Sequence, residues 1–126
     1  MSHRVLVVDD EPAIRETLSF MLEMEGFEVA QASDGVQALQ QVRNFRPQVV
    51  LLDVMIPKLD GYRVCAAIKA DPALTGVKVV ILTAMGQVAD RERAFAAGAD
   101  AYLAKPFDEE VLLSLLRSPD ENGDVA

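Results

Sequence analysis

"VVLLDVMIPKLDG", residues 49–61, joins an uninterrupted apolar run to an acid, and this combination decides the fold. Residues 49–52 have the composition of a strand that is buried on both faces, as in the centre of a parallel sheet. Asp53 follows directly, where an apolar side chain would be less costly to bury. The same pattern occurs in "VLVVDD", residues 5–10, where Asp9 and Asp10 follow an apolar run. Two buried strands that end in acids raise the question of a shared site.

The composition is that of one ordinary globular domain. The 126 residues can bury a core, since 51% of them are hydrophobic and 25% are charged. The formal net charge of -8 argues against a nucleic-acid surface on this chain. The single Cys65 excludes an internal disulfide, and the sequence shows neither a membrane-span pattern nor a signal-peptide pattern. We therefore expect a cytoplasmic protein that contacts no membrane and no nucleic acid directly.

Five apolar runs alternate with segments that carry a helical apolar stripe. The expected strands are residues 4–8, 27–32, 48–52, 77–83 and 101–104. The stripes between and after them are formed by Ile14, Leu18, Met21 and Leu22; Val36, Leu39 and Val42; Val64, Cys65 and Ile68; Val88 and Phe95; Val111, Leu112, Leu115 and Leu116. This alternation predicts an α/β fold, a doubly wound parallel sheet with helices on both faces. We expect the domain to span residues 1–118, with 119–126 as a flexible tail or the start of a linker.

In such a sheet, ligands bind beyond the carboxyl ends of the strands. The residues at those ends are Asp9, Asp10, Asp53, Thr83 and Lys105. Neighbouring strands lie about 4.8 Å apart, so acids on adjacent strands share one cleft. At ~5 Å two like charges repel by ~3 kcal/mol with an effective dielectric near 20, and a divalent cation relieves this repulsion. Oxygen ligands without His or Cys favour magnesium, with manganese or calcium as alternatives, over zinc.

A hydroxyl and an ammonium group complete this set. Thr83 offers the hydroxyl donor, and Lys105 offers a positive charge on the far side of the same cleft. Together with a cation, these groups suit a phosphoryl group, whose oxygens need balancing charge during transfer. One of the carboxylates can itself accept that group, because aspartyl phosphates are a known covalent form.

The order and spacing of these residues resemble the receiver domain of two-component response regulators, including its chemotaxis members. The resemblance covers residues 4–117 and rests on "DD" at 9–10, "DVMIPKLDG" at 53–61, "ILTAMG" at 81–86 and "AKPF" at 104–107. It implies a flavodoxin-like (βα)5 sandwich, with a five-stranded parallel sheet of order 2-1-3-4-5. It also implies a phosphoacceptor domain of a two-component phosphorelay rather than an enzyme with a separate substrate.

The resemblance assigns the acids to a metal and phosphorylation site. Asp53 would be the phosphoacceptor and, with Asp9 and Asp10, a ligand of Mg²⁺, with Mn²⁺ as an alternative. The backbone carbonyl of Met55 would complete the ligands from the protein. The phosphoryl donor would be a sensor histidine kinase or a histidine phosphotransfer protein.

The resemblance assigns the remaining residues to catalysis and switching. Thr83 and Lys105 would bind the phosphoryl oxygens, and Thr83 with Tyr102 would switch the surface around the fourth helix, fifth strand and fifth helix. That surface would control a downstream effector or a fused output domain. The resemblance further implies a cis bond before Pro106. Met55 and Met85 would flank the path of water to the phosphoryl group and so slow its loss.

Three alternative functions fit the residue pattern less well. Phosphatases of the haloacid-dehalogenase type use a similar residue set, but they place a D-x-D pattern after the first strand and carry a cap, for which this chain is too short. A flavin or nucleotide binder needs a phosphate loop after the first strand, where Asp9 and Asp10 would repel a phosphate. A receiver that has lost phosphotransfer would lack part of the residue set. Taken singly, Asp10 and Asp60 also suit helix N-termini.

Overall fold

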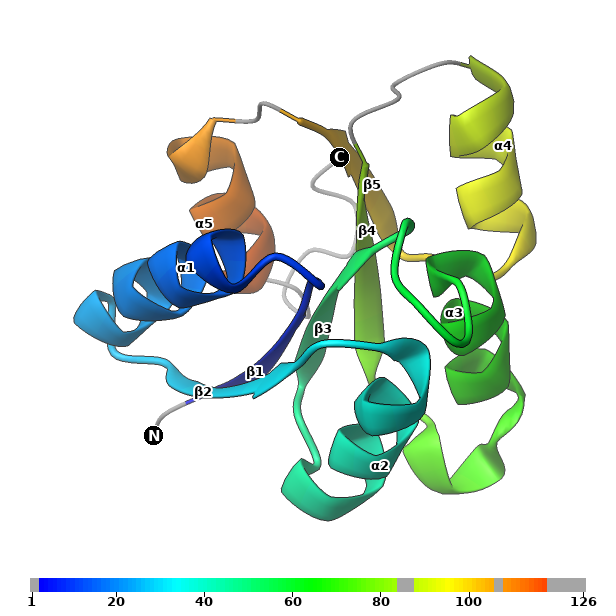
Figure 1. The fold of residues 1–126 in the computed structure, drawn as a ribbon, viewed down its shortest axis with the longest axis horizontal. Helices are drawn as coiled ribbons and strands as arrows, with labels where there is room; N and C mark the ends of the chain where they lie inside the picture. Colours follow the sequence, from blue (N-terminus) through cyan, green and yellow to red (C-terminus); the bar gives the residue numbers. More distant parts are fainter. Residues whose placement is uncertain (1–2, 84–87, 106–107, 118–126) are drawn as a thin grey trace.

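The computed structural model describes residues 3–83, 88–105 and 108–117, and over these residues the chain forms a five-stranded parallel sheet with helices on both faces (Figure 1). The strand order, β2-β1-β3-β4-β5, is the predicted one. The strands are β1 (Arg4–Val8), β2 (Glu28–Ala32), β3 (Val49–Asp53), β4 (Lys78–Thr83) and β5 (Ala101–Ala104). The helices are α1 (Pro12–Met24), α2 (Gly35–Phe45), α3 (Gly61–Ala70), the 3-10 turn η1 (Pro72–Leu74), α4 (Val88–Ala96) and α5 (Glu109–Arg117).

The sheet divides the core into two layers. Helices α1 and α5 cover one face, and α2, α3 and α4 cover the other (Figure 1). Alternate residues of each central strand point to opposite layers: Leu6 belongs to the α2/α3/α4 layer, while Val5 and Val7 belong to the α1/α5 layer. Strand β3 is buried along its whole length. Its continuous apolar sequence is explained by this double burial.

The strand boundaries differ from the expected ones by one residue at most. Strands β2, β3 and β4 begin one residue later than the sequence pattern predicts. Strand β3 also includes Asp53, so the acid lies within the hydrogen-bonded strand rather than after it. The carboxylate is therefore placed by sheet geometry.

Local sequence sets the helix starts nearest this edge. Pro12 occupies the first turn of α1, where its missing N–H costs nothing. Asp34 and Asp60 are the N-caps of α2 and α3, and they accept hydrogen bonds from the backbone N–H groups of Gln37 (2.8 Å) and Arg63 (3.0 Å). Asp60 thus has the capping role that the sequence suggested. Glu11 precedes α1 without a side-chain cap.

Three residues that the apolar stripes placed in the core are exposed: Val36, Phe95 and Val111. In α2 the buried stripe runs through Ala38 and Val42, because a small side chain lets the helix approach the sheet. In α4 the buried residue is Ala94, and in α5 Leu113 is buried where Val111 was expected. Each error shifts the stripe by one or two positions, which helical periodicity alone does not resolve.

No helix within the described part of the chain is long and apolar enough to cross a membrane. The predicted tail at 119–126, the predicted cis bond before Pro106 and the side chains of Met85 and Val88 lie outside the described residues.

Candidate functional site

Strand register brings the predicted residues to one edge of the sheet. Val8 of β1 pairs with Leu52 of β3, so Asp9 and Asp53 come next on adjacent strands. On the other side of β3, Asp53 pairs with Leu82, which precedes Thr83. Thr83 pairs with Ala104 of β5, which precedes Lys105. The five residues that the sequence placed at strand ends therefore lie along one edge.

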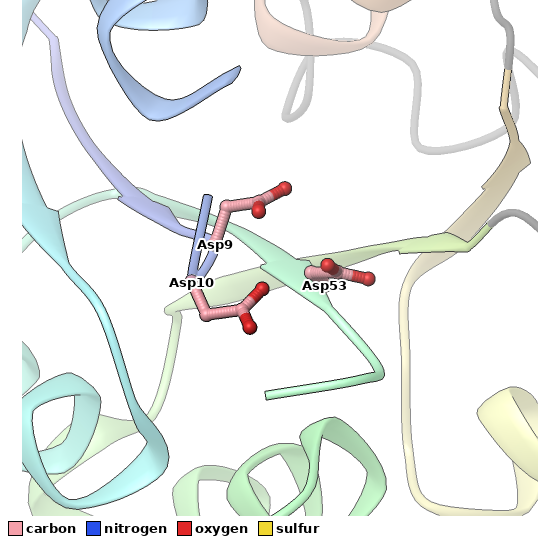
Figure 2. Close-up of side chains that lie close together, drawn as sticks. All are labelled: Asp9, Asp10 and Asp53. Atoms are coloured by element: carbon pink, nitrogen blue, oxygen red, sulfur yellow. The ribbon is translucent and has the colours of Figure 1, made fainter. Parts of the chain in front are cut away.

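The three acids form one cluster (Figure 2). Asp9, Asp10 and Asp53 can each place one carboxylate oxygen within 4.8 Å of the others. Asp9 and Asp53 are almost buried, with exposed fractions of 2% and 8%, while Asp10 is exposed. The cluster therefore has two acids held in the protein and one at the solvent boundary.

Backbone N–H groups orient the two buried carboxylates. Asp9 Oδ1 accepts a hydrogen bond from the N–H of Glu11 at 3.0 Å. Asp53 Oδ1 accepts one from the N–H of Met55 at 3.4 Å. Each acid is thus turned toward the loop that follows its own strand, and in each case an oxygen remains for a cation.

Lys105 supplies the positive charge on the far side of the cluster. Its Nζ lies 3.1 Å from Asp9 Oδ2 and 3.6 Å from Asp53 Oδ2. Burial raises the pKa of Asp53, the Lys105 ammonium opposes that rise, and the Asp9 carboxylate adds to it. The backbone N–H of Lys105 also donates to the carbonyl of Thr83 at 2.6 Å, which ties the ends of β4 and β5 together.

Thr83 and Tyr102 occupy the predicted switch positions on neighbouring strands. Thr83 is fully buried. The Tyr102 ring packs against the core layer formed by α2, α3 and α4, and its hydroxyl is buried with no hydrogen-bond partner among the described residues. The aromatic ring therefore points inward in this structure. Their roles in switching stay a prediction.

The loop between β3 and α3 is fixed by contacts that the sequence analysis missed. A Cβ on Gly61 would lie 2.6 Å from the carbonyl oxygen of Asp53, so only glycine allows α3 to start this close to the strand end. Lys58, which has a φ of +73°, places its Nζ 3.5 Å from Asp34 Oδ2. The N–H of Gly35 donates to the carbonyl of Pro57 at 3.1 Å. Two features of the sequence could have indicated these contacts: the glycine of the Asp60-Gly61 pair, and Asp34 at the start of α2.

A second missed contact lies on α1, where the guanidinium of Arg15 donates to the backbone carbonyl of Asp9 at 2.8 Å. Side chains in a helix tilt toward its N-terminus, so an arginine in this turn can reach the preceding strand end. Met55, in contrast, extends a side chain that is 66% exposed, and only its backbone is placed near the acids.

The chemistry of the donors fits a hard divalent cation. The cluster offers carboxylate oxygens alone, from residues that converge at one point, and a basic residue already balances part of their charge. Mg²⁺ prefers such oxygen ligands, retains several waters and is well served by an acid such as Asp10 that faces solvent. A parallel α/β sandwich with three acids, a buried threonine and a lysine at one sheet edge is the arrangement that the resemblance to receiver domains implied.

Comparison with known proteins agrees with this class. The family model for the response regulator receiver domain matches residues 5–117. The chain belongs to this family, and it is a receiver domain of two-component response regulators.

Relatives and solved structures match over almost the whole chain. The DNA-binding dual master transcriptional regulator RpaA of Synechocystis is 42% identical over 115 residues, which are 91% of this chain and 48% of that protein. The chemotaxis protein CheY4 of Vibrio cholerae is 32% identical, with a TM-score of 0.85 and coverage of 92% of this chain and 97% of the other. The chain spans about half the length of the curated relatives that it matches.

One solved structure bears on the acid cluster. The receiver domain of sensor histidine kinase PA1611 from Pseudomonas aeruginosa holds a magnesium ion in its active-site cleft. It is 34% identical, with a TM-score of 0.84, and the match covers 92% of this chain and 95% of that one. The acid cluster of this chain and that magnesium-bound neighbour together suggest a magnesium site here.

Proposed function

We propose that Asp53 accepts a phosphoryl group, and the observation that carries this is its carboxylate, almost buried yet facing Lys105 at 3.6 Å and two further acids. A carboxylate oxygen of Asp53 forms the new bond to phosphorus, while the bond from phosphorus to the donor breaks and the donor keeps its electron pair. The donor is a phosphohistidine of a sensor kinase or phosphotransfer protein, or a small acyl phosphate.

The neighbouring residues hold the reacting groups in place. Asp9, Asp10 and Asp53 would hold Mg²⁺. The backbone carbonyl of Met55 would add one ligand, and Mn²⁺ is expected to substitute for Mg²⁺. When bound, this cation balances negative charge on the phosphoryl oxygens. The Lys105 ammonium, which lies beside Asp9 and Asp53, would bind one phosphoryl oxygen, and the Thr83 hydroxyl would donate to another.

Phosphorylation acts on partners through the surface formed by α4, β5 and α5. Phosphorylation shifts a balance between two arrangements of α4, β5 and α5, with Thr83 and Tyr102 as the switch residues. This face controls a downstream effector or a fused output domain, which the greater length of relatives such as RpaA supports. The domain itself, with a net charge of -8, binds no nucleic acid. It catalyses only its own phosphorylation and slow dephosphorylation, in the cytoplasm.

Intact-mass analysis tests the phosphoacceptor. Wild type incubated with acetyl phosphate and Mg²⁺ should gain the mass of one phosphoryl group, and chelation of the metal should prevent the gain. Asp53→Asn should gain none, while Asp71→Asn, which changes an acid outside the cleft, should behave as wild type. An equal gain by Asp53→Asn would assign the phosphoacceptor to another residue. Multiple turnovers of a phosphate monoester would instead favour the phosphatase alternative.

A further inference from the structure

Arg15 binds the peptide that joins two of the proposed metal ligands. It is the fourth residue of α1, and its Nη1 donates to the carbonyl of Asp9 at 2.8 Å. That carbonyl belongs to the peptide bond between Asp9 and Asp10. One peptide unit earlier, between Val8 and Asp9, the N–H of Asp9 donates to the carbonyl of Ala32 at 3.2 Å. The backbone of Asp9 is therefore held on its N-terminal side by the end of β2, and on its C-terminal side, toward Asp10, by Arg15 of α1.

The guanidinium is itself held in one orientation. Its Nε donates to Gln31 Oε1 on β2 at 3.1 Å, so the planar group bridges α1, the end of β1 and β2. The Arg15 carbonyl accepts the hydroxyl of Ser19 at 2.7 Å. Lysine has the same charge but a single ammonium on a flexible stem, and it does not reproduce a two-sided bridge of this kind.

We propose that Arg15 is a positioning residue for the metal site: it sets the plane of the Asp9–Asp10 peptide and thereby aims both carboxylates at the cation without touching it. The orientation of this peptide matters most for Asp10, because Asp10 is the exposed member of the cluster. Groups that orient ligands from outside the coordination sphere commonly change metal affinity by about 10- to 100-fold. The inference rests on the proposed function, because it takes the acid cluster to be a cation site.

The charge of Arg15 and its positioning role predict opposite changes in Mg²⁺ affinity when Arg15 is replaced. As a cation near the cluster, Arg15 repels Mg²⁺, so removing it would tighten Mg²⁺ binding if charge were its main contribution. As a positioning residue, its loss weakens binding. Arg15→Lys keeps the charge and loses the bridge, so it weakens binding only if position matters. The direction of the change therefore separates the two effects.

The experiment is a titration of the whole chain with Mg²⁺. Binding is measured by calorimetry and, in parallel, by the NMR chemical shift of the Glu11 amide. The sequence has no tryptophan whose fluorescence could report the binding. The Glu11 N–H bonds to Asp9 Oδ1, which makes its chemical shift a direct report on that carboxylate. We expect Arg15→Lys and Arg15→Gln each to weaken Mg²⁺ binding by about 10-fold. Gln31→Ala, which removes only the second contact of the guanidinium, should weaken it less.

Arg43→Gln is the matched control for the loss of one positive charge, since Arg43 is exposed at the end of α2. It should bind Mg²⁺ as wild type does, and a loss equal to that of Arg15→Gln would overturn the proposal. Unchanged or tighter binding by both Arg15 variants would also overturn it. If wild type binds no Mg²⁺, the metal site of the proposed function fails instead.

Denaturant unfolding of each variant distinguishes an effect on the orientation of the metal ligands from a general loss of stability. Weaker Mg²⁺ binding in an Arg15→Lys protein that unfolds cooperatively with wild-type stability supports positioning, because a purely structural role would lower stability first. If neither Arg15 variant folds, Gln31→Ala decides the matter: weaker binding supports the proposal, and unchanged binding overturns it.

Discussion

Helices α3 and α4 cover the same face of the sheet but are attached to it very differently. Five of the ten residues of α3 are buried, and Gly61 at its start lies directly against the backbone of Asp53. Of residues 90–96 in α4, whose side chains the structure describes, only Ala94 is buried, and Phe95 is 45% exposed. The proposed phosphoacceptor, Asp53, thus lies against a firmly packed helix, whereas the proposed output surface includes a helix that buries fewer side chains.

The contacts of α4 are partly polar and pass through α3. The Tyr62 hydroxyl donates to the carbonyl of Asp90 at 3.3 Å, and the guanidinium of Arg93 lies 4.3 Å from the centre of the Tyr62 ring. Tyr62 follows Gly61, so the residue that supports α4 is a neighbour of the one that touches Asp53. Among the described residues, α4 buries one side chain whereas five residues of α3 are buried, so we expect movement of α4 to disturb less of the core than movement of α3.

Truncation of one large apolar side chain in each helix should give the largest difference between the two helices. Ile68→Ala in α3 empties a buried site and should lower the free energy of unfolding by about 2–5 kcal/mol. Phe95→Ala in α4 removes a half-exposed ring and should cost less than about 1 kcal/mol. Urea unfolding of both variants measures this. Similar losses for the two would mean that α4 is as firmly packed as α3.

Mg²⁺ binding should stabilise the part of the molecule that contains the acid cluster and α3. If Mg²⁺ binds only the folded state, Mg²⁺ at 100 times its dissociation constant should raise the free energy of unfolding by about 2.7 kcal/mol. Asp10→Asn should remove most of this response. In the metal-free protein, the same change should stabilise by less than about 1 kcal/mol, because it relieves repulsion at an exposed site.

Denaturant melts with and without Mg²⁺ measure both effects of Asp10→Asn. A variant that keeps the full Mg²⁺ response would remove Asp10 from the site. Hydrogen exchange on the same samples should show the added protection near the acid cluster and less of it in α4, which would sharpen the contrast between the two regions.

The part of the molecule that the sequence predicts well is the part fixed by strands. Continuous apolar runs located β1, β3 and β4 within a residue, and sheet register then required Asp9, Asp53 and Lys105 to meet at one edge. The order of the strands came from the family resemblance, since spacing alone does not choose between sheet topologies.

The features that the sequence did not predict depend on contacts between side chains of one helix and residues of another helix or strand. Phe95 has the spacing of a core residue, but α4 approaches the sheet through the smaller Ala94 and leaves the ring half-exposed. Arg15 reads as a solvated residue of an amphipathic helix, because nothing in the sequence shows that its side chain folds back to the Asp9 carbonyl. Local pattern fixes which face is apolar, and tertiary contacts fix which polar residues serve the site.

The smallest expected effect concerns the bridge between the two helices. Arg93→Gln removes a cation from the Tyr62 ring, an interaction that contributes about 0.5–1 kcal/mol at an exposed site. Global stability should hardly change, because α4 can detach without unfolding the core. The amides of α4 should instead exchange several-fold faster, while those of α3 keep their wild-type rates. Arg63→Gln, on the exposed face of α3, is the matched control and should leave the α4 amides unchanged. Equal acceleration of exchange in α3 and α4 would show that the two helices open as one unit. The difference in packing between the two helices would then not explain how the proposed output surface moves independently of the acid cluster.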